Sequence, residues 1–450
     1  MAEQITRICD ASTAVSDTHP EAAAAPRAVW SAIDAAATPV SSLIITAGLV
    51  RALTPESYGL LVVALAASGL SLAVNPAIAA TTTKFVSEAR GRKSTAGRSA
   101  ASVITASLIA AVAIDLVLLA AAILFRDSLG HLLFGAYADV HPAEAGSLLI
   151  LAVLAISIQQ VDAVLAAAIK GMERFRRQAL LEIGSRMVLA AAVTAAAAAT
   201  VNVEIVLLAQ CVVCALSALV RAGALQRLLP GSRLFALPDR SEVSAVLRYG
   251  SWMWVSAIAG VVYSNADRVI VGRVLGAAAA GQFNVYVQLA QLVHYIPGSL
   301  FAFSFPAFSR LAGRGRESHA EIARSYRTYS TLVVGIALAI AMSILVGRVG
   351  LLGALVGRVF DPRHAGQTLT LLVAGFFLLS FNIVPYYLLL ALGGSRPVSL
   401  IGTGSVLAAL ASMAVLIPLY GLTGAALGRL VYGLGCLLLI ERARRYLSDT

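Results

Sequence analysis

Long apolar runs constrain this chain more than any other feature of its sequence. About 20 helical residues are enough to cross the roughly 30 Å hydrocarbon core of a bilayer. Twelve apolar segments of that length recur along the 450 residues. They fall at about 30–50, 58–80, 100–125, 146–169, 178–199, 204–226, 249–271, 282–305, 328–346, 367–391, 398–418 and 422–440. The pattern predicts an all-α polytopic membrane protein with about 12 transmembrane helices.

The composition agrees with lipid as the solvent. The chain is 59% hydrophobic and 13% charged, with a mean hydropathy of +0.84, whereas soluble domains are about 45–50% apolar and about 25% charged. The net charge of +11 is spread over short loops rather than along one soluble face, which argues against nucleic acid as a partner.

Enzymatic motifs and metal-ligand patterns do not emerge from the sequence. No glycine-rich phosphate loop precedes a lysine, so we expect no ATPase in this chain, no enzymatic activity and no cofactor. Cys211 and Cys214 lie inside an apolar run without a second ligand pair, and a structural zinc site needs four ligands. We therefore expect no metal.

The positions of lysine and arginine predict the orientation. If the N-terminus lies in the cytoplasm, 25 of the 34 basic residues fall in cytoplasmic segments, as the positive-inside rule requires. We expect a multi-pass protein of the cytoplasmic membrane with both termini in the cytoplasm. Its predicted parts are a tail (1–29), a six-helix bundle (30–226), a linker (227–248, with the nearby Arg221 counted on the cytoplasmic side), a second bundle (249–441) and a tail (442–450).

An internal repeat relates the two predicted bundles. A shift of 222 residues places Arg51 on Arg273 and Gly59 on Gly281, and other matches fall on loop glycines, loop arginines and mid-helix amides. Because each half has six spans, both halves enter the membrane in the same direction, so the repeat is parallel. Transporters of this kind bind substrate between the halves. The repeat favours an alternating-access transporter over a channel or a membrane enzyme.

Four motifs carry a family resemblance. They are Arg51–Gly59 (RALTPESYG), Lys84–Gly91 (KFVSEARG), Ala266–Gly276 (ADRVIVGRVLG) and Phe305–Leu311 (FPAFSRL). In this order and spacing, over roughly residues 30–440, the chain resembles the polysaccharide (Wzx-type) flippases of the multidrug/oligosaccharidyl-lipid/polysaccharide (MOP) superfamily. The resemblance implies a MATE-like fold with two six-helix bundles around a central cavity.

The same resemblance implies a function. Members of this family flip undecaprenyl-pyrophosphate-linked oligosaccharide repeat units across the cytoplasmic membrane for exopolysaccharide, capsule or O-antigen synthesis. The implied partners are the lipid-linked oligosaccharide and the lipid bilayer, with a polysaccharide polymerase and its co-polymerase as further candidates. The alternative is a MATE-like, ion-coupled antiporter of drugs or cations, which shares the twelve spans.

Polar residues inside the spans predict the substrate site. A charge at a helix centre costs roughly 2.5–3.5 kcal/mol on insertion scales and usually faces the bundle interior or a water-filled cavity. Arg268 is the leading candidate for contact with an anionic head group, and snorkelling to the outer interface is the alternative. Asp267 lies about 100° around the helix from Arg268, so each needs its own partner. The opposite bundle is one source, and a structural interhelical pair is the alternative role for Asp267.

Further candidates lie on the next span and at helix ends. Asn284, Gln288 and Gln291 recur at four- and three-residue spacing, which predicts one polar face for sugar hydroxyls, or else interhelical hydrogen bonds. The remaining predicted substrate-binding residues are the repeat-related Arg51 and Arg273, and Asn75 beside a proline hinge. Asp34, Asp115 and Asp162 have no cation at helical spacing and are candidates for ion or proton coupling.

Overall fold

The structure is an assembly of long helices. The computed structural model describes residues 20–69, 78–79, 81–83, 85–86, 100–229, 260–302, 304–312, 319–356 and 362–448. All regular structure in these ranges is helical. Eight of the described helices are long and apolar enough to cross a membrane, and Ala37–Ala52 and Pro55–Ser68 are shorter apolar helices. The prediction of an all-α polytopic membrane protein is confirmed.

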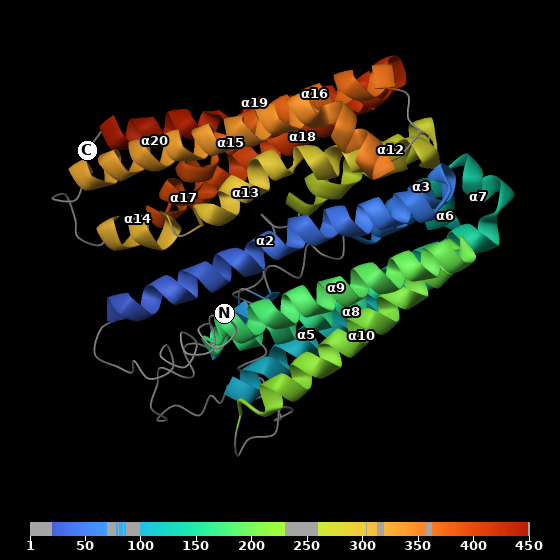
Figure 1. Cartoon of the computed structure of the whole chain (residues 1–450), viewed down its shortest axis with the longest axis horizontal. Helices are drawn as coiled ribbons and strands as arrows, with labels where there is room; N and C mark the ends of the chain where they lie inside the picture. The colour runs from blue at the N-terminus through green and yellow to red at the C-terminus, as the bar shows by residue number, and fades with distance from the viewer. Residues whose placement is uncertain are drawn as a thin grey trace.

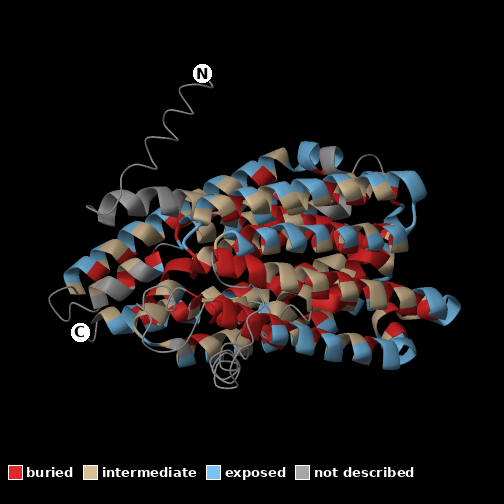
Figure 2. Ribbon diagram, turned by 90° about the horizontal axis from the view of Figure 1, so that it is seen from below, coloured by how far each residue is buried: buried red, intermediate tan, exposed pale blue. Residues whose placement is uncertain are grey.

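Apolar side chains cover the outside of the bundles. Leu124 and Val346 are 77% and 80% exposed, which would be unfavourable in water over so many positions but is expected where lipid is the solvent. Figure 2 shows the buried residues gathered along the middle of the molecule and the exposed ones on its outer faces and ends.

The N-terminal half forms one bundle. Its helices are α2 (Pro20–Ala52), α3 (Pro55–Ser68), α5 (Ala100–Leu124), α6 (Arg126–Phe134), α7 (Ala136–Val140), α8 (Pro142–Gly171), α9 (Phe175–Thr200) and α10 (Val203–Gln226). α2 packs on α9, and α8 packs between α5 and α10. Thr54 separates α2 from α3, because its hydroxyl accepts the Ser57 N–H at 3.2 Å and Pro55 occupies the first helical position.

The C-terminal half forms a second bundle. Residues 260–275 are helical. They are followed by α12 (Ala277–Ala290), α13 (Leu292–Leu300), α14 (Ser304–Ala312), α15 (His319–Val356), α16 (Pro362–Ser380), α17 (Ile383–Ala391), α18 (Ser395–Tyr420), α19 (Leu422–Cys436) and α20 (Leu438–Ser448). α19 packs against both α16 and α18.

The predicted span 282–305 is divided among α12, α13 and α14. Pro297 lies inside α13 and has no N–H to bond the carbonyl of Val293. The hydroxyl of Ser380 on α16 donates to that carbonyl instead, at 3.1 Å. A neighbouring helix therefore satisfies the backbone group that the proline leaves without its helical partner.

The repeat is visible at the crossing of α3 and α12. A shift of 222 residues carries Pro55–Ser68 onto Ala277–Ala290, so the two helices have matching bounds, and they pack against each other. A Cβ on Gly59 would lie 1.7 Å from the carbonyl oxygen of Ala277, and one on Gly281 would lie 3.1 Å from the Cα of Gly59. Two repeat-related glycines therefore meet at one crossing, which only residues without a Cβ allow.

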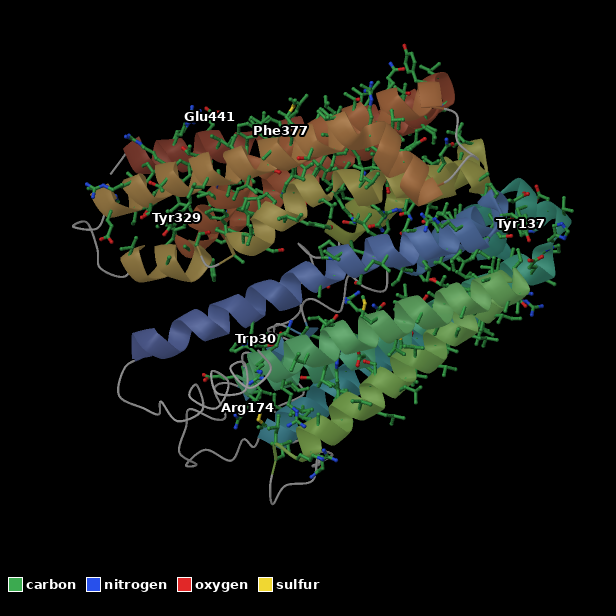
Figure 3. All side chains as sticks on the ribbon, viewed as in Figure 1. Trp30, Tyr137, Arg174, Tyr329, Phe377 and Glu441 are labelled. Carbon is green, nitrogen blue, oxygen red and sulfur yellow. The ribbon has the colours of Figure 1, made fainter. Side chains whose placement is uncertain are left out.

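The two bundles converge at the end of the molecule that carries α7, here called the α7 end, and diverge toward the end where α2 begins and α20 ends (Figure 1). Besides the crossing of α3 and α12, Arg273 of the C-terminal half donates to the carbonyl oxygens of His131, at 3.0 Å, and Leu132 on α6. Figure 3 places Tyr137 at the α7 end, and Trp30 and Arg174 toward the other end.

Several predicted features fall outside the described residues. They are Asn75 with its neighbouring proline, most of the tail 1–29 and most of the linker 227–248. α2 begins at Pro20 and so extends into the segment predicted as tail. Asp34 lies in α2, but its side chain is not among those that the structure describes.

Candidate substrate-binding cavity

A buried ion pair anchors the C-terminal half. Asp267, on the helix of residues 260–275, and Arg429, on α19, are 0% and 4% exposed. The Nε of Arg429 lies 2.6 Å from Oδ2 of Asp267, while Oδ1 accepts the backbone N–H of Arg268 at 2.8 Å. The idea that the opposite bundle supplies the partner of Asp267 is wrong. Both residues belong to the same half, because α19 packs beside this helix rather than across the interface.

Aromatic rings enclose the arginine of this pair. The guanidinium of Arg429 lies 4.9 Å from the ring centre of Tyr263 and 5.2 Å from that of Phe376. Tyr263 in turn stacks on Tyr432 with 3.7 Å between the ring centres. These cation–π contacts fix the position of the Arg429 guanidinium, which forms part of a cavity lining.

Arg268 lines a cavity of about 270 Å³ together with Arg429 and the aromatic rings around it. Its Nη1 donates to the carbonyl oxygen of Ser264, one turn earlier, and its buried Nε has no hydrogen-bond partner among the described residues. The cavity is lined by Gly260, Tyr263, Ser264, Asn265, Arg268, Gln291, His294, Tyr295, Phe376, Leu379, Arg429 and Tyr432. Its volume suits one sugar ring or a pyrophosphate group rather than a whole oligosaccharide.

Asn265, in the cavity lining, lies close to the N-terminal half. A Cβ on Gly69, just beyond α3, would lie 2.9 Å from the side-chain amide of Asn265. The charged side chains in the lining are Arg268 and Arg429, and Asp267 balances one of them. The described lining therefore carries one positive charge in excess, next to aromatic faces and amides.

The predicted polar face on α12 is divided between two roles. The side-chain amide of Asn284 donates to the hydroxyl of Tyr58 at 2.7 Å, and Gln288 accepts from Ser42 at 3.0 Å. Both bonds join the two halves. Gln291 donates to Gln288 and reaches the cavity. One residue of the predicted face therefore lines the cavity, and the other two make interhelical hydrogen bonds.

The arginines at the α7 end lie away from the cavity lining. Arg51 is exposed in the last turn of α2, and Arg273 contacts α6 as described above. Among the acidic candidates, Asp115 lies in α5 and Asp162 in α8. The structure therefore brings Asp267, Arg268 and Gln291 together in the C-terminal half, with Gln288 bonded to Gln291, whereas Arg51, Arg273, Asp115 and Asp162 lie outside the cavity lining.

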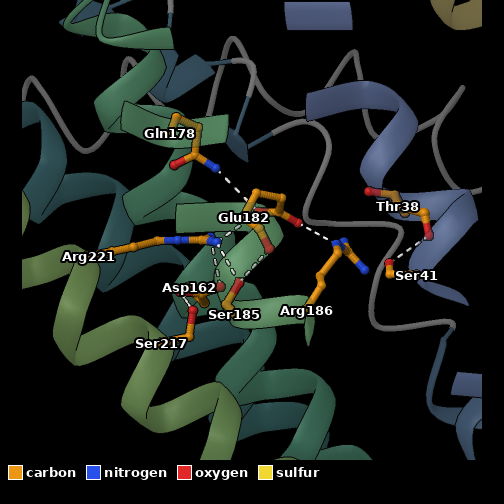
Figure 4. Close-up of polar contacts among 9 residues, drawn as sticks. All are labelled: Thr38, Ser41, Asp162, Gln178, Glu182, Ser185, Arg186, Ser217 and Arg221. Carbon is orange, nitrogen blue, oxygen red and sulfur yellow. Dashed lines mark hydrogen bonds and ion pairs between the residues drawn. The ribbon is translucent and has the colours of Figure 1, made fainter. Parts of the chain in front are cut away.

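A second buried charge network lies in the N-terminal half (Figure 4). Arg221, on α10, contacts Asp162 of α8 and Glu182 of α9, each at 2.8 Å. Glu182 also pairs with Arg186 at 2.6 Å, and Ser217 donates to Asp162 at 3.1 Å. The placement of Arg221 among the cytoplasmic linker residues is wrong, because it lies inside α10 and is 2% exposed. Asp162 thus has a cation, supplied by another helix.

Sequence reasoning alone did not assign Tyr263, Tyr432 and Phe376 to the cavity. Tyr263 lies four residues before Asp267 and Tyr432 three after Arg429, so helical spacing places each on the same face as a buried charge. That signal could have identified the two tyrosines. Phe376 comes from a third helix and has no such signal.

Removing the acid of the buried pair is expected to destabilise the protein. Asp267→Asn leaves Arg429 buried without a counter-ion, which costs about 3–5 kcal/mol. We expect a lower melting temperature and a lower yield of folded protein in detergent, measured by thermal unfolding and size-exclusion chromatography. Asp267→Asn combined with Arg429→Met should recover part of the loss, because no lone charge remains. Asp127→Asn, which breaks an exposed pair with Arg126, is the control and should change little. Wild-type stability in Asp267→Asn would contradict a structural role for the pair.

Comparison with known proteins agrees with this architecture. The solved structures include an inward-facing multidrug resistance MATE family transporter of the MOP superfamily, with a TM-score of 0.71 and 13% identity over 93% of this chain and 98% of that one. A point mutant of the Vibrio cholerae MATE transporter VcmN matches with a TM-score of 0.69 and 13% identity over 94% and 96% of the two chains. At these identities the likeness shows the fold.

The sequence comparisons identify the family. A protein of Shigella flexneri named "Putative O-antigen transporter" is 26% identical over 184 residues, which are 40% of this chain and 41% of that protein. The chain thus matches less than half the length of that relative. The family described as polysaccharide biosynthesis protein matches residues 31–312, more than half of the chain. The chain therefore belongs to the polysaccharide biosynthesis protein family and has the fold of the MATE transporters of the MOP superfamily.

Proposed function

We propose that this protein flips undecaprenyl-pyrophosphate-linked oligosaccharide repeat units from the inner to the outer leaflet of the cytoplasmic membrane. The products serve exopolysaccharide, capsule or O-antigen synthesis, and a polysaccharide polymerase with its co-polymerase would receive them. The observation that carries the proposal is the cavity lined by Arg268 and Arg429 with amides and aromatic rings. Family membership and the partial match to a protein named as an O-antigen transporter support it.

Each part of the cavity has a role in this proposal. The Nε of Arg268, buried and without a partner, is available to the pyrophosphate, since guanidinium groups bind phosphate oxygens through charge-assisted hydrogen bonds. The amides of Asn265 and Gln291 suit sugar hydroxyls, and the faces of Tyr263 and Tyr432 suit the apolar faces of sugar rings.

The convergence of the halves and the distribution of charge together support a direction of transport. We place the α7 end at the outer surface, because the predicted cytoplasmic segments without Arg221 hold 24 of the 34 basic residues, and α2 begins and α20 ends at the opposite end. The crossing of α3 and α12 then closes the outer side. The substrate enters from the cytoplasmic leaflet, and the crossing must open to release it.

The charge of the cavity weighs against the alternative, a drug or cation antiporter. The carboxylate of Asp267 is already paired with Arg429, so the charge of Arg268 is not neutralised within the described lining. A lipophilic cation would be repelled by this positive charge. The alternative predicts that loss of the protein changes tolerance to lipophilic cations, whereas the flippase proposal predicts no such change.

Deleting the gene is expected to abolish the surface polymer and leave the lipid-linked repeat unit in the inner leaflet. Surface polymer can be measured by immunoblotting, and the sidedness of the lipid-linked unit by its accessibility to a membrane-impermeant lectin in spheroplasts and in inverted vesicles. Complementation with the wild-type gene is the control. Normal polymer in a clean deletion would contradict the proposal, and altered tolerance to lipophilic cations would favour the antiporter.

A further inference from the structure

A buried carboxyl group in the N-terminal half has no cation beside it among the residues that the structure describes. Asp115, on α5, is 5% exposed. Its Oδ1 accepts a hydrogen bond from Nε2 of Gln160 on α8 at 2.7 Å. Its Oδ2 is buried, and the described side chain that faces it is the neutral Ser157 of α8. Asp115 therefore differs from Asp267 and Asp162, each of which faces an arginine.

The surroundings of Asp115 are polar but uncharged. Ser157, one turn before Gln160 on α8, is 8% exposed, and its hydroxyl is a hydrogen-bonding neighbour of the Asp115 carboxyl. Of the described helices, α8 packs most extensively on α5, and α6 also contacts it. Their titratable and charged residues are Glu144, Asp162 and Lys170 on α8, and Arg126, Asp127 and His131 on α6. None of these forms an ion pair with Asp115 in the described part of the chain.

A lone buried carboxylate is costly, and a proton removes the cost. An ionised carboxylate without a counter-ion loses several kcal/mol of hydration on burial, whereas the protonated acid is neutral and can donate one hydrogen bond. A metal cation would need about six oxygen ligands. The described cluster offers one carboxyl, one amide and one hydroxyl, which suffice for a proton.

We propose that Asp115 is a proton-binding site that is loaded and emptied once in each transport cycle. Loading adds one proton to the carboxylate and forms the acid, whose O–H donates to the side chain of Ser157 or Gln160. Release restores the carboxylate with its bond from Gln160. Coupling to transport rests on the proposed function, but proton binding does not. The site belongs to one half, because the 222-residue shift places Asp115 on Ala337.

Infrared difference spectroscopy tests the binding of the proton. The purified full-length protein in lipid nanodiscs is titrated from neutral to alkaline pH, a range in which exposed carboxyl groups are already ionised and give no such band. We expect a carbonyl-stretching band of a protonated carboxylic acid that is lost at alkaline pH and is absent in Asp115→Asn, a variant that keeps the size of the side chain. Asp127→Asn, an exposed carboxyl on α6, should keep the band. A band that persists in folded Asp115→Asn would overturn the proposal.

Proteoliposomes test the coupling. We expect an imposed pH gradient to accelerate the movement of an undecaprenyl-pyrophosphate-linked oligosaccharide by the wild type, and to lose this effect in Asp115→Asn, while both bind the lipid equally well. Gradient stimulation that survives in Asp115→Asn would overturn the coupling. If the wild type moves no lipid-linked oligosaccharide at all, the proposed function fails, while the infrared band still decides whether Asp115 binds a proton.

Discussion

Linking positions 63 and 272 by a disulfide is expected to abolish transport, and a reductant is expected to restore it. Val63 lies on α3 of the N-terminal half and Gly272 on the helix of residues 260–275. A Cβ at position 272 would lie 3.7 Å from the Cβ of Val63, close to the roughly 3.8 Å of natural disulfides. The same Cβ would lie 2.5 Å from a methyl group of Val63, which Val63→Cys removes.

The reason for this large effect is the position of the contact. The bundles converge at the α7 end and diverge toward the start of α2 and the end of α20, so a covalent link between α3 and the neighbouring half prevents separation at the α7 end. If alternating access requires the halves to part there, the linked protein binds substrate but does not release it outside. We expect loss of essentially all movement of lipid-linked oligosaccharide in proteoliposomes under oxidising conditions.

A matched control shows whether a loss of transport comes from linking the two halves or from disulfide formation as such. Gly130→Cys with Ala145→Cys joins α6 to α8 within the N-terminal half, and the separation of the two Cβ positions is also 3.7 Å. Both cysteine pairs are introduced after the four native cysteines have been replaced. A protease site inserted near residue 240 reports the link between residues 63 and 272, because on a denaturing gel the two halves stay joined after cleavage only when that disulfide has formed. Full transport by the linked 63–272 protein would contradict the outer gate.

Replacing Arg268 is expected to weaken substrate binding strongly without unfolding the protein. Hydrogen bonds to a charged group contribute about 1.5–3 kcal/mol, which is roughly tenfold to hundredfold in the dissociation constant. Arg268 has no acidic partner of its own among the described side chains: Asp267 accepts its backbone N–H, while the Asp267 side chain pairs with Arg429. Arg268→Ala therefore leaves no buried carboxylate without a counter-ion, whereas Arg429→Ala would leave Asp267 without its own.

Binding of undecaprenyl pyrophosphate to the purified protein in detergent measures this effect. Arg268→Lys should keep part of the affinity, because it retains the charge but loses the planar fork of donors. Arg348→Ala, which removes an exposed arginine of α15 outside the cavity, should bind as the wild type does. Unchanged affinity in folded Arg268→Ala would remove Arg268 from the site.

The sequence could predict which residues are unusual but not which residues they meet. Helical spacing correctly separates Asp267 from Arg268, yet the partner of Asp267 lies 162 residues further along the chain. Asp162 and Arg221 are 59 residues apart, and Arg221 looked like a loop residue because it lies close to a helix end. Periodicity gives the face of a helix on which a side chain lies, and the neighbour on that face depends on how the helices pack.

The sequence by itself determined that the protein is helical and lies in a lipid bilayer, because these properties follow from the length of its apolar segments. Residue spacing along the chain was enough to find the repeat, and local motifs were enough to find the family resemblance. Tertiary structure alone decided the site. It showed that Arg268 lines a cavity with Gln291 and that Asn284 and Gln288 instead join the halves. It also showed that, in the part of the chain that is described, Asp162 pairs with an arginine and Asp115 does not. A buried charge is stabilised by groups within a few ångströms of it in space, and contacts between helices that are distant in sequence determine which groups those are.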